Sequence, residues 1–244
     1  MNLESFKTNS FQIGNLIWKT YEPIIDTDSA FYKRVRDQAK SKIHFSPNAS
    51  QSSQHRSLDV KYQNQLRGGL AEAYAKLLIE EYAAANNIKV EVIRYDDVLT
   101  ATTGFTFETI KGEYDIKVII HNTTKLLESR SSVAHNISFV DAISNYDTIG
   151  RYTSFTKPNE SFNDYYIRPL YEYLDFRQKN FYSRDFEDLL KTNRIKLHFT
   201  GGADFNLMQT EGYNQSMGQG STNYRVIKIL RGFTIDDFLK KLLS

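Results

Sequence analysis

Apolar side chains recur at helical spacing in residues 70–84. They stand at i, i+3, i+4, i+7 and i+8 positions, which form one stripe along an α-helix; they are Leu70, Ala73, Tyr74, Leu77, Leu78 and Tyr82. The pattern predicts a helix with one buried face, preceded by Gly68 and Gly69. Glu72 lies about 100° from Ala73 around this helix, at the border between core and solvent.

Alternating apolar and polar positions predict the strands. Residues 88–95 alternate in this way, and residues 112–132 form two short strands joined by a polar turn at 121–124. Later strands are predicted over residues 164–173, 194–200 and 224–230. Pro169 cannot donate a ladder hydrogen bond, so its strand is expected at a sheet edge or at a bulge. Gly201 and Gly202 are expected to end the strand before them.

The remaining segments predict helices and loops. Residues 1–60 are expected to form an N-terminal helical extension, with a basic segment at 33–42 and a polar connector at 48–54. Short helices are expected at 139–144 and 183–192, a loop at 218–220, and a helix at 234–243 capped by Thr234. The order of elements predicts one α/β (α+β) domain over residues 1–244, with a mixed central sheet flanked by helices. Its core spans residues 68–200, and residues 201–244 add a strand and a helix.

Composition narrows the classes of protein. Of the 244 residues, 40% are hydrophobic and 25% charged, which is typical of a folded domain. Cysteine is absent, so disulfides and thiolate metal sites are excluded. No secretory signal is evident, and the apolar runs are too short to span a bilayer, so a cytoplasmic location is expected. The net charge of +2 neither requires nor excludes a nucleic-acid partner.

Three charged side chains stand out on the two strands of residues 112–132. Asp115 opens the first strand, and Glu128 and Arg130 are two residues apart on the second. Residues i and i+2 of a strand face the same side, so Glu128 and Arg130 should project together toward the neighbour of Asp115. Carboxylates hold Mg²⁺ through oxygen, and the metal ion can activate water beside a phosphate. The pattern therefore favours a Mg²⁺ site that cleaves phosphodiester bonds.

The order of these elements resembles the core of the PD-(D/E)XK nuclease superfamily, which includes restriction endonucleases. The elements are a helix with Glu72, a strand, a strand opening at Asp115 and a strand with Glu128-Ser129-Arg130. The resemblance covers residues 68–132 and implies a restriction-endonuclease-like core. It also implies that Asp115 and Glu128 are catalytic metal ligands for Mg²⁺, with Glu72 as a further ligand.

This sequence departs from the family pattern at one position. Arg130 stands where the family has lysine, and an arginine cannot take a proton from water at neutral pH. Lys117 faces the same side as Asp115 and is the second candidate for the catalytic cation. A competing alignment uses Asp115-Ile116-Lys117 as the motif, with Asp96 or Asp97 as the earlier acid. It ranks lower because residues 111–113 read as a turn, whereas the motif normally follows apolar residues in mid-strand.

Other catalytic patterns are absent from the sequence. The histidines lack paired metal spacing, His198 is interpreted as structural, and the chain has neither a Walker motif nor a GxSxG motif. The leading hypothesis is an ATP-independent, site-specific endonuclease of double-stranded DNA, expected as a homodimer with a cognate DNA methyltransferase. A structure-specific repair or phage-defence nuclease, and a non-catalytic nucleic-acid-binding protein, remain open.

Overall fold

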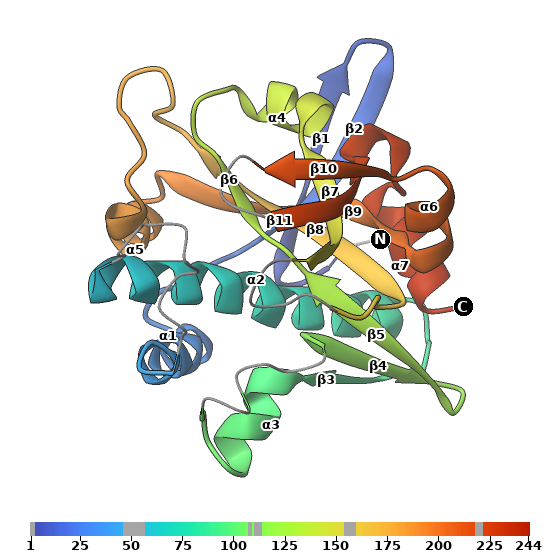
Figure 1. The fold of residues 1–244 in the computed structure, drawn as a ribbon, viewed down its shortest axis with the longest axis horizontal. Helices are drawn as coiled ribbons and strands as arrows, with labels where there is room; N and C mark the ends of the chain where they lie inside the picture. Colours follow the sequence, from blue (N-terminus) through green and yellow to red (C-terminus); the bar gives the residue numbers. More distant parts are fainter. Residues whose placement is uncertain (1–2, 46–56, 107–108, 110–113, 154–159, 218–221) are drawn as a thin grey trace.

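The computed structural model describes residues 3–45, 57–106, 109, 114–153, 160–217 and 222–244. It contains a large mixed sheet and a small antiparallel sheet, with helices packed around both (Figure 1). The expected mixed α and β architecture with a mixed sheet is confirmed. The connector expected at 48–54, the turn at 111–113 and the loop at 218–220 lie outside the described residues.

The large sheet has eight strands. Seven follow one path in space: β1 (Phe6–Ile13), β2 (Leu16–Pro23), β9 (Ile195–Asp204), β8 (Tyr165–Tyr173), β5 (Thr123–Ser129), β4 (Ile116–Ile120) and β3 (Glu91–Arg94). The eighth, β6 (Ser132–Ala134), follows β5 along the chain and pairs with β8 further on. The pairings of β8 with β5 and β6 are parallel, and the other pairings are antiparallel. The small sheet is antiparallel, in the order β10 (Tyr213–Met217), β11 (Thr222–Lys228) and β7 (Asp147–Thr153).

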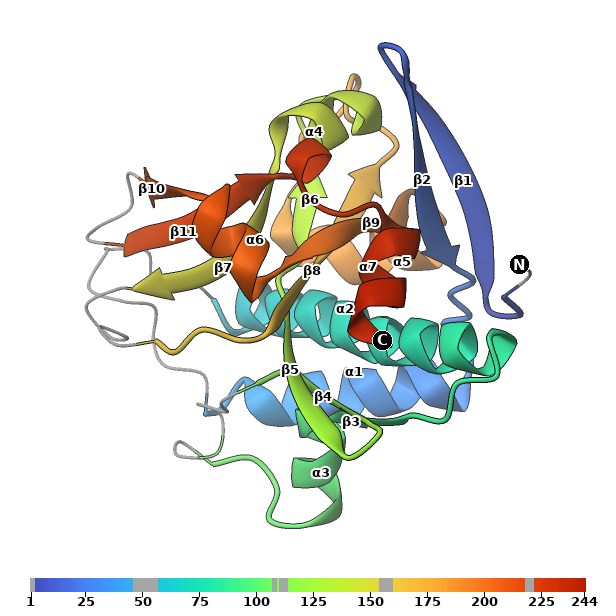
Figure 2. The ribbon, with the colours of Figure 1, turned by 90° about the vertical axis from the view of Figure 1, so that its right-hand side faces the viewer.

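The predicted helix of residues 70–84 is part of a longer helix, α2 (Leu58–Ala85). Its 28 residues span roughly 42 Å, and the Ser57 hydroxyl caps it by accepting a bond from the Val60 N–H. Gly68 and Gly69 lie inside this helix rather than before it. A Cβ at Gly69 would lie 3.3 Å from Cγ1 of Val35, so the glycine lets helix α1 (Ala30–Lys42) pack closely against α2 (Figure 2).

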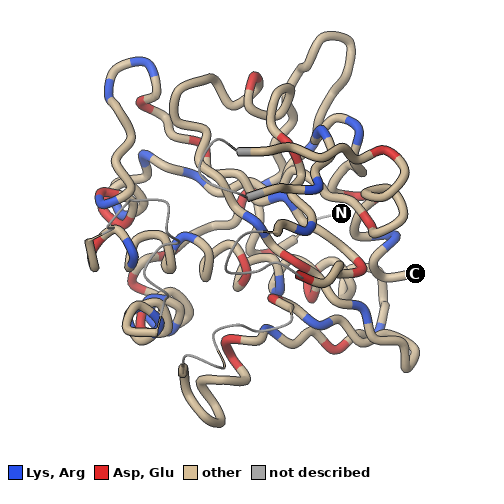
Figure 3. Tube along the Cα trace, viewed as in Figure 1, with Lys and Arg blue, Asp and Glu red and all other residues tan. Residues whose placement is uncertain are grey.

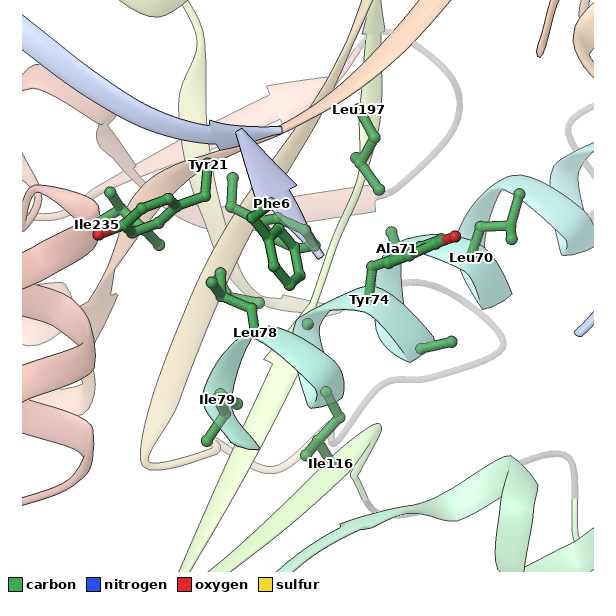
Figure 4. Packing of buried hydrophobic residues seen from close by; sticks show 14 of the residues in the cluster. Phe6, Tyr21, Leu70, Ala71, Tyr74, Leu78, Ile79, Ile116, Leu197 and Ile235 are labelled. Atoms are coloured by element: carbon green, nitrogen blue, oxygen red, sulfur yellow. The ribbon is translucent and has the colours of Figure 1, made fainter. Parts of the chain in front are cut away.

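The main hydrophobic core lies between α2 and the large sheet. Tyr74, Leu78 and Ile79 of α2 lie in one cluster with Ile116 of β4 and Leu197 of β9 (Figure 4). The C-terminal helix α7 (Ile235–Leu242) closes this core, and its predicted cap is confirmed because the Thr234 hydroxyl accepts from the Asp237 N–H. Twelve residues along α2 are buried, and its apolar side chains form a large part of the main core. Among the helices that the structure describes, none is long and apolar enough to cross a membrane.

The expectation of a purely helical N-terminal extension is wrong. Residues 6–23 form the hairpin of β1 and β2, and the first helix begins at Ala30. The hairpin turns at Gly14-Asn15, where Gly14 has a φ of 56°. A two-residue turn with glycine between apolar runs is a hairpin signal. The same logic holds at His121-Asn122, where both residues have positive φ and connect β4 to β5.

Other boundaries also differ from the predicted ones. The strand expected over residues 88–95 is limited to β3, and helix α3 (Tyr95–Ala101) follows at once. Pro169 lies in β8, an interior strand, and the β8–β9 register shifts between Ile167 and Pro169. The bulge is therefore confirmed and the edge position is wrong. The other short helices are α4 (Phe139–Asn145), α5 (Phe186–Lys191) after a 3₁₀ turn (Ser183–Asp185), and α6 (Phe205–Thr210).

Gly201 and Gly202 do not end a strand, because β9 continues through both. Gly201 has a φ of +127°, and a Cβ there would lie 2.1 Å from the carbonyl oxygen of Phe233. Gly202 exchanges backbone hydrogen bonds with Phe233. The glycines allow the segment before α7 to lie directly against the strand.

We expect Gly201→Ala to lower the free energy of unfolding by about 3 kcal/mol or more, because it combines a backbone clash with an unfavourable φ. Gly14→Ala is the matched control, since Gly14 has a positive φ but no atom within 4 Å of the added Cβ. Its cost should be about 1 kcal/mol. Urea denaturation of both variants measures the difference, and equal losses would contradict the packing explanation.

Candidate active site

Register places Asp115 beside Glu128 at one end of the β4–β5 hairpin. Ile116 pairs with Leu127, so the preceding Asp115 comes level with Glu128 on the neighbouring strand. The Asp115 Oδ2 accepts a hydrogen bond of 2.7 Å from the backbone N–H of Ser129. The backbone carbonyl of Asp115 accepts from the Tyr95 N–H, where β3 gives way to α3. Three consecutive antiparallel strands therefore position Asp115.

Arg130 lies between two carboxylates. Its guanidinium Nη2 is 2.7 Å from Oε1 of Glu128 and 3.0 Å from Oε1 of Glu160. The same guanidinium packs over the ring of Tyr152 at 4.3 Å from the ring centroid. Glu160 is itself held by the Tyr152 N–H, at 2.6 Å, and Glu128 accepts from the amide of Asn163 at 3.0 Å. The guanidinium is thus fixed in place beside the Asp115–Glu128 pair.

Part of the Arg130 guanidinium has hydrogen-bonding capacity to spare. Its Nε is buried and has no hydrogen-bond partner in the described part of the chain. Burial opposes the charge of Arg130, but Glu128 and Glu160 more than offset this effect, and the pKa of Arg130 lies above its usual value. Arg130 therefore stays protonated, and it holds a fixed positive charge beside the carboxylates.

Glu72 approaches the same region from α2. Its side chain is 15% exposed, and its Oε2 is 3.9 Å from the Nε of Arg94 on β3. Burial raises the pKa of Glu72, and the charges of Asp96 and Glu128 add to this rise while Lys42 and Arg94 oppose it. Glu72 is therefore an inward-facing carboxyl group rather than a surface residue.

The pKa of Asp115 reflects its burial and the acidic group beside it. Burial raises the pKa of Asp115 to about 7, and the charge of Glu72 adds to the rise. The Ser129 N–H, Arg130 and Lys42 act in the opposite direction. A buried carboxyl group whose charged form is destabilised by a nearby carboxylate is a favourable ligand for a cation.

Lys117 contacts an aromatic ring. It is on β4 opposite Leu126, and its Nζ lies over the ring of Tyr114 at 4.9 Å from the centroid. It forms no ion pair within the described ranges.

The acids of the competing alignment are already paired with cations. Asp96 forms ion pairs with Lys42 at 2.7 Å and with Arg94 at 3.2 Å, and Asp97 lies 3.6 Å from Arg94. Arg94 also donates to Gln38 on α1. These contacts connect α3 to α1 and β3, so they account for Asp96 and Asp97 by packing.

The donor chemistry fits a hard divalent cation, although the described residues hold no preformed cluster of three or more His, Cys, Asp or Glu side chains able to bind a metal. Asp115 and Glu72 offer crowded carboxyl oxygens, the ligands that Mg²⁺ prefers. Glu128 is engaged by Arg130 and Asn163, so its use as a ligand would require at least one of these contacts to rearrange.

The sequence analysis did not predict three residues of the site, namely Glu160, Asn163 and Tyr152. Asn163 lies 35 positions beyond Glu128 in the chain, and Glu160 lies 30 positions beyond Arg130. No short motif relates them to the β4–β5 hairpin. Only the parallel pairing of β8 with β5 returns this part of the chain to the site.

Comparisons with known proteins add one similarity. An uncharacterized protein of Methanocaldococcus jannaschii is 24% identical over 237 residues, covering 89% of this chain and 84% of that protein. No family model matches the chain. No solved structure matches it.

Proposed function

We propose that the chain is a Mg²⁺-dependent, ATP-independent nuclease that hydrolyses phosphodiester bonds in double-stranded DNA. The observation that carries the proposal is the Glu128–Arg130 ion pair beside Asp115, with Glu72 close enough to feel the charge of Glu128 and to act on Asp115. This arrangement combines oxygen ligands for a hard cation with a fixed positive charge for a phosphate. In this proposal Asp115, Glu128 and Glu72 hold Mg²⁺, and Arg130 binds the phosphate.

The chemistry divides between the bound cation and Arg130. When bound, Mg²⁺ supplies a water of lowered pKa and stabilises negative charge on the phosphate. Arg130 remains protonated and cannot act as a base, so its role is to stabilise charge. We assign its positive charge, held between Glu128 and Glu160, to the phosphate. Glu160 holds the guanidinium in position when Glu128 rearranges to bind the metal.

A restriction-type, site-specific enzyme is the form of this proposal that we favour, on the basis of the sequence resemblance. Such an enzyme would act as a homodimer in the cytoplasm, because two symmetric active sites cut both strands of a symmetric sequence. A cognate DNA methyltransferase would protect the host sequence.

The test is incubation of supercoiled plasmid and of linear DNA with the purified protein, in Mg²⁺ and in EDTA. Cleavage in Mg²⁺ alone supports the proposal, and discrete fragments of reproducible length support the site-specific form. Cleavage confined to branched, nicked or single-stranded substrates would instead indicate a structure-specific repair or defence nuclease. DNA binding without cleavage under any divalent cation would indicate a non-catalytic binding protein.

We expect Glu72→Gln to weaken the affinity for Mg²⁺ without preventing folding. Loss of one carboxylate should raise the Mg²⁺ concentration for half-maximal cleavage by about tenfold or more. The matched control is Glu80→Gln, an α2 glutamate whose side chain is 39% exposed and paired with Lys76. A titration of the cleavage rate against Mg²⁺ concentration measures the effect. Identical curves for the two variants would show that Glu72 is not a metal ligand.

A further inference from the structure

The small sheet forms a wall of a cleft whose described lining contains no acidic side chain. The cleft has a volume of about 630 Å³, and helix α6 contributes to it beside the strands β7, β10 and β11 (Figure 1). Its described lining residues are Arg151, Thr153, Phe162, Gln209, Asn214, Asn223, Tyr224 and Arg225. Two of these side chains are cationic and none is anionic, so the described lining is suited to a negatively charged ligand.

Sheet register gathers the polar side chains of this cleft. Thr153 of β7 pairs with Asn223 of β11. Arg225 of β11 pairs with Asn214 of β10. Residues directly opposite each other share a face of a sheet, and so do residues two apart on one strand. These rules place the four side chains on one face, where Arg151, two positions before Thr153, joins them.

Arg151 carries a charge that no described acid balances. Its guanidinium lies over the ring of Phe162, 4.5 Å from the ring centroid. Within the part of the chain that the structure describes, its side chain forms no ion pair and no hydrogen bond. Stacking on a ring fixes the plane of a guanidinium, while its N–H groups point outward around the edge of that plane. The residue is partly exposed, so these donors are accessible to a ligand.

Arg225 is held in place by neutral acceptors. Its Nε donates to the Met208 carbonyl at 3.0 Å, and its Nη2 donates to the Gln209 carbonyl at 2.6 Å, near the end of α6. Its Nη1 makes a longer contact of 3.4 Å with the side-chain oxygen of Asn214. Among the described residues, no carboxylate pairs with it. These contacts position the guanidinium without neutralising its charge.

The neutral members of the lining suit the oxygens of a DNA backbone. They include one hydroxyl, of Thr153, and three side-chain amides, of Gln209, Asn214 and Asn223. Arginine, threonine, asparagine and glutamine are among the side chains that contact DNA phosphates. The three amide residues are exposed, so the cleft is open to solvent. Because small-molecule sites are lined mainly by apolar side chains, this open polar lining favours a polymer backbone as the ligand.

Phe162 connects this cleft to the candidate active site. The next residue in the chain is Asn163, whose amide donates to Glu128. Two positions before Phe162 is Glu160, which pairs with Arg130. The ring beneath the Arg151 guanidinium therefore belongs to the same short segment that holds Glu128 and Arg130. A DNA strand with one phosphate at Arg130 would pass close to the cleft.

We propose that this cleft binds a phosphate of the DNA strand near the phosphate at Arg130, with Arg151 as its main contact and Arg225 as a second positive charge. The inference rests on the proposed function for the identity of its ligand, and it adds the face of the protein that the DNA contacts. The contact is independent of base sequence, because it is made to the backbone. None of the described lining residues is a candidate metal ligand, so the cleft positions the DNA.

The test is the affinity for a fluorescently labelled DNA duplex, measured by anisotropy in EDTA over a series of salt concentrations. We expect Arg151→Gln to weaken binding by about tenfold and to reduce the slope of log affinity against log salt by about 1. Arg177→Gln is the matched control. Arg177 also lies over a ring, that of Phe176 at 5.3 Å, but it is exposed and outside the cleft. This control should bind as the wild-type protein does.

Asn223→Asp is the second cleft variant, and it decides the question if Arg151→Gln does not fold. It adds a negative charge at an exposed position with little change of shape, so it should also weaken DNA binding. Wild-type affinity in the folded cleft variants, an equal loss in Arg177→Gln, or no DNA binding by the wild-type protein would overturn the proposal. Binding of inorganic phosphate that requires Arg151, with unchanged DNA binding, would also overturn it and would indicate a site for a free anion.

A failure of this inference is distinct from a failure of the proposed function, because binding is measured in EDTA and cleavage is measured in Mg²⁺. Weakened binding by the cleft variants of a protein that does not cleave DNA would support the cleft and contradict the nuclease. Cleavage by a protein whose cleft variants bind DNA normally would support the nuclease and contradict the cleft.

Discussion

Replacing Asp115 by asparagine is expected to abolish DNA cleavage and also to make the metal-free protein more stable. The asparagine removes a carboxylate ligand, and its side-chain oxygen can still accept from the Ser129 N–H. It also removes a charge whose burial is unfavourable, because burial and Glu72 raise the pKa of Asp115 from 3.8 to about 7. Loss of activity with a gain in stability would separate a functional carboxylate from a structural one.

The stability gain should depend on pH in a definite direction. The raised pKa means that the folded protein holds a proton on Asp115 which the unfolded chain has already released. The contribution of Asp115 to the free energy of unfolding of the wild-type protein is therefore most favourable below about pH 4, and it is lost as the pH rises toward about 7. The advantage of Asp115→Asn should be small at pH 4 and reach on the order of 2 to 4 kcal/mol at pH 8.

Urea denaturation in EDTA at several pH values measures this advantage. Asp28→Asn, at an exposed aspartate, is the control and should match wild type throughout. Filter binding of DNA in EDTA should show that Asp115→Asn still binds. Normal cleavage by this variant would show that the site is misassigned, and a loss of stability at pH 8 would show that Asp115 is a structural residue.

Arg130→Ala is expected to lower the rate of DNA cleavage by about a hundredfold or more, because it removes the fixed charge assigned to the phosphate. The same change leaves Glu128 and Glu160 without their shared cation, so it should also cost about 3 kcal/mol of stability. Arg130→Lys should keep measurable activity, since it retains the charge and introduces the residue usual in the nuclease superfamily that the sequence resembles. Single-turnover cleavage at saturating DNA, below the melting temperature of each variant, measures these rates.

Lys117→Ala is the control for Arg130. Its ammonium group lies over Tyr114 rather than on the candidate carboxylates, so cleavage should continue at close to the wild-type rate. An inactive Lys117→Ala together with an active Arg130→Ala would reverse the roles. The motif would then be Asp115-Ile116-Lys117, with Asp96 or Asp97 as the earlier acid.

Local periodicity predicted the elements that support the site. The apolar stripe from Leu70 to Tyr82 identified α2, and the alternation on either side of His121-Asn122 identified the β4–β5 hairpin. The register was not predicted, because a turn over residues 121–124 would place Asp115 opposite Arg130, whereas the observed turn at His121-Asn122 brings it level with Glu128. Basic and acidic positions are interspersed along the chain (Figure 3), so net charge gave no further indication of a site.

Contacts that depend on distant segments could not be predicted in this way. Glu160 and Asn163 reach the site only because β8 returns beside β5, and nothing near Arg130 in the sequence specifies that return. Gly201 and Gly202 look like a strand end locally, whereas their role depends on Phe233, some thirty positions away. The hairpin at Gly14-Asn15, by contrast, carried a local signal that the helical interpretation overlooked.

Thermal unfolding with and without Mg²⁺ or Mn²⁺ at pH 8 tests most directly whether Asp115 belongs to a divalent-cation site. A cation that binds only the folded protein stabilises it by about 2.7 kcal/mol at a hundredfold excess over Kd, which corresponds to a rise in Tm of about 5 to 10 °C. We predict this rise for the wild-type protein and for Asp28→Asn, and none for Asp115→Asn. An equal rise in Asp115→Asn, or no rise in the wild-type protein, would contradict the account.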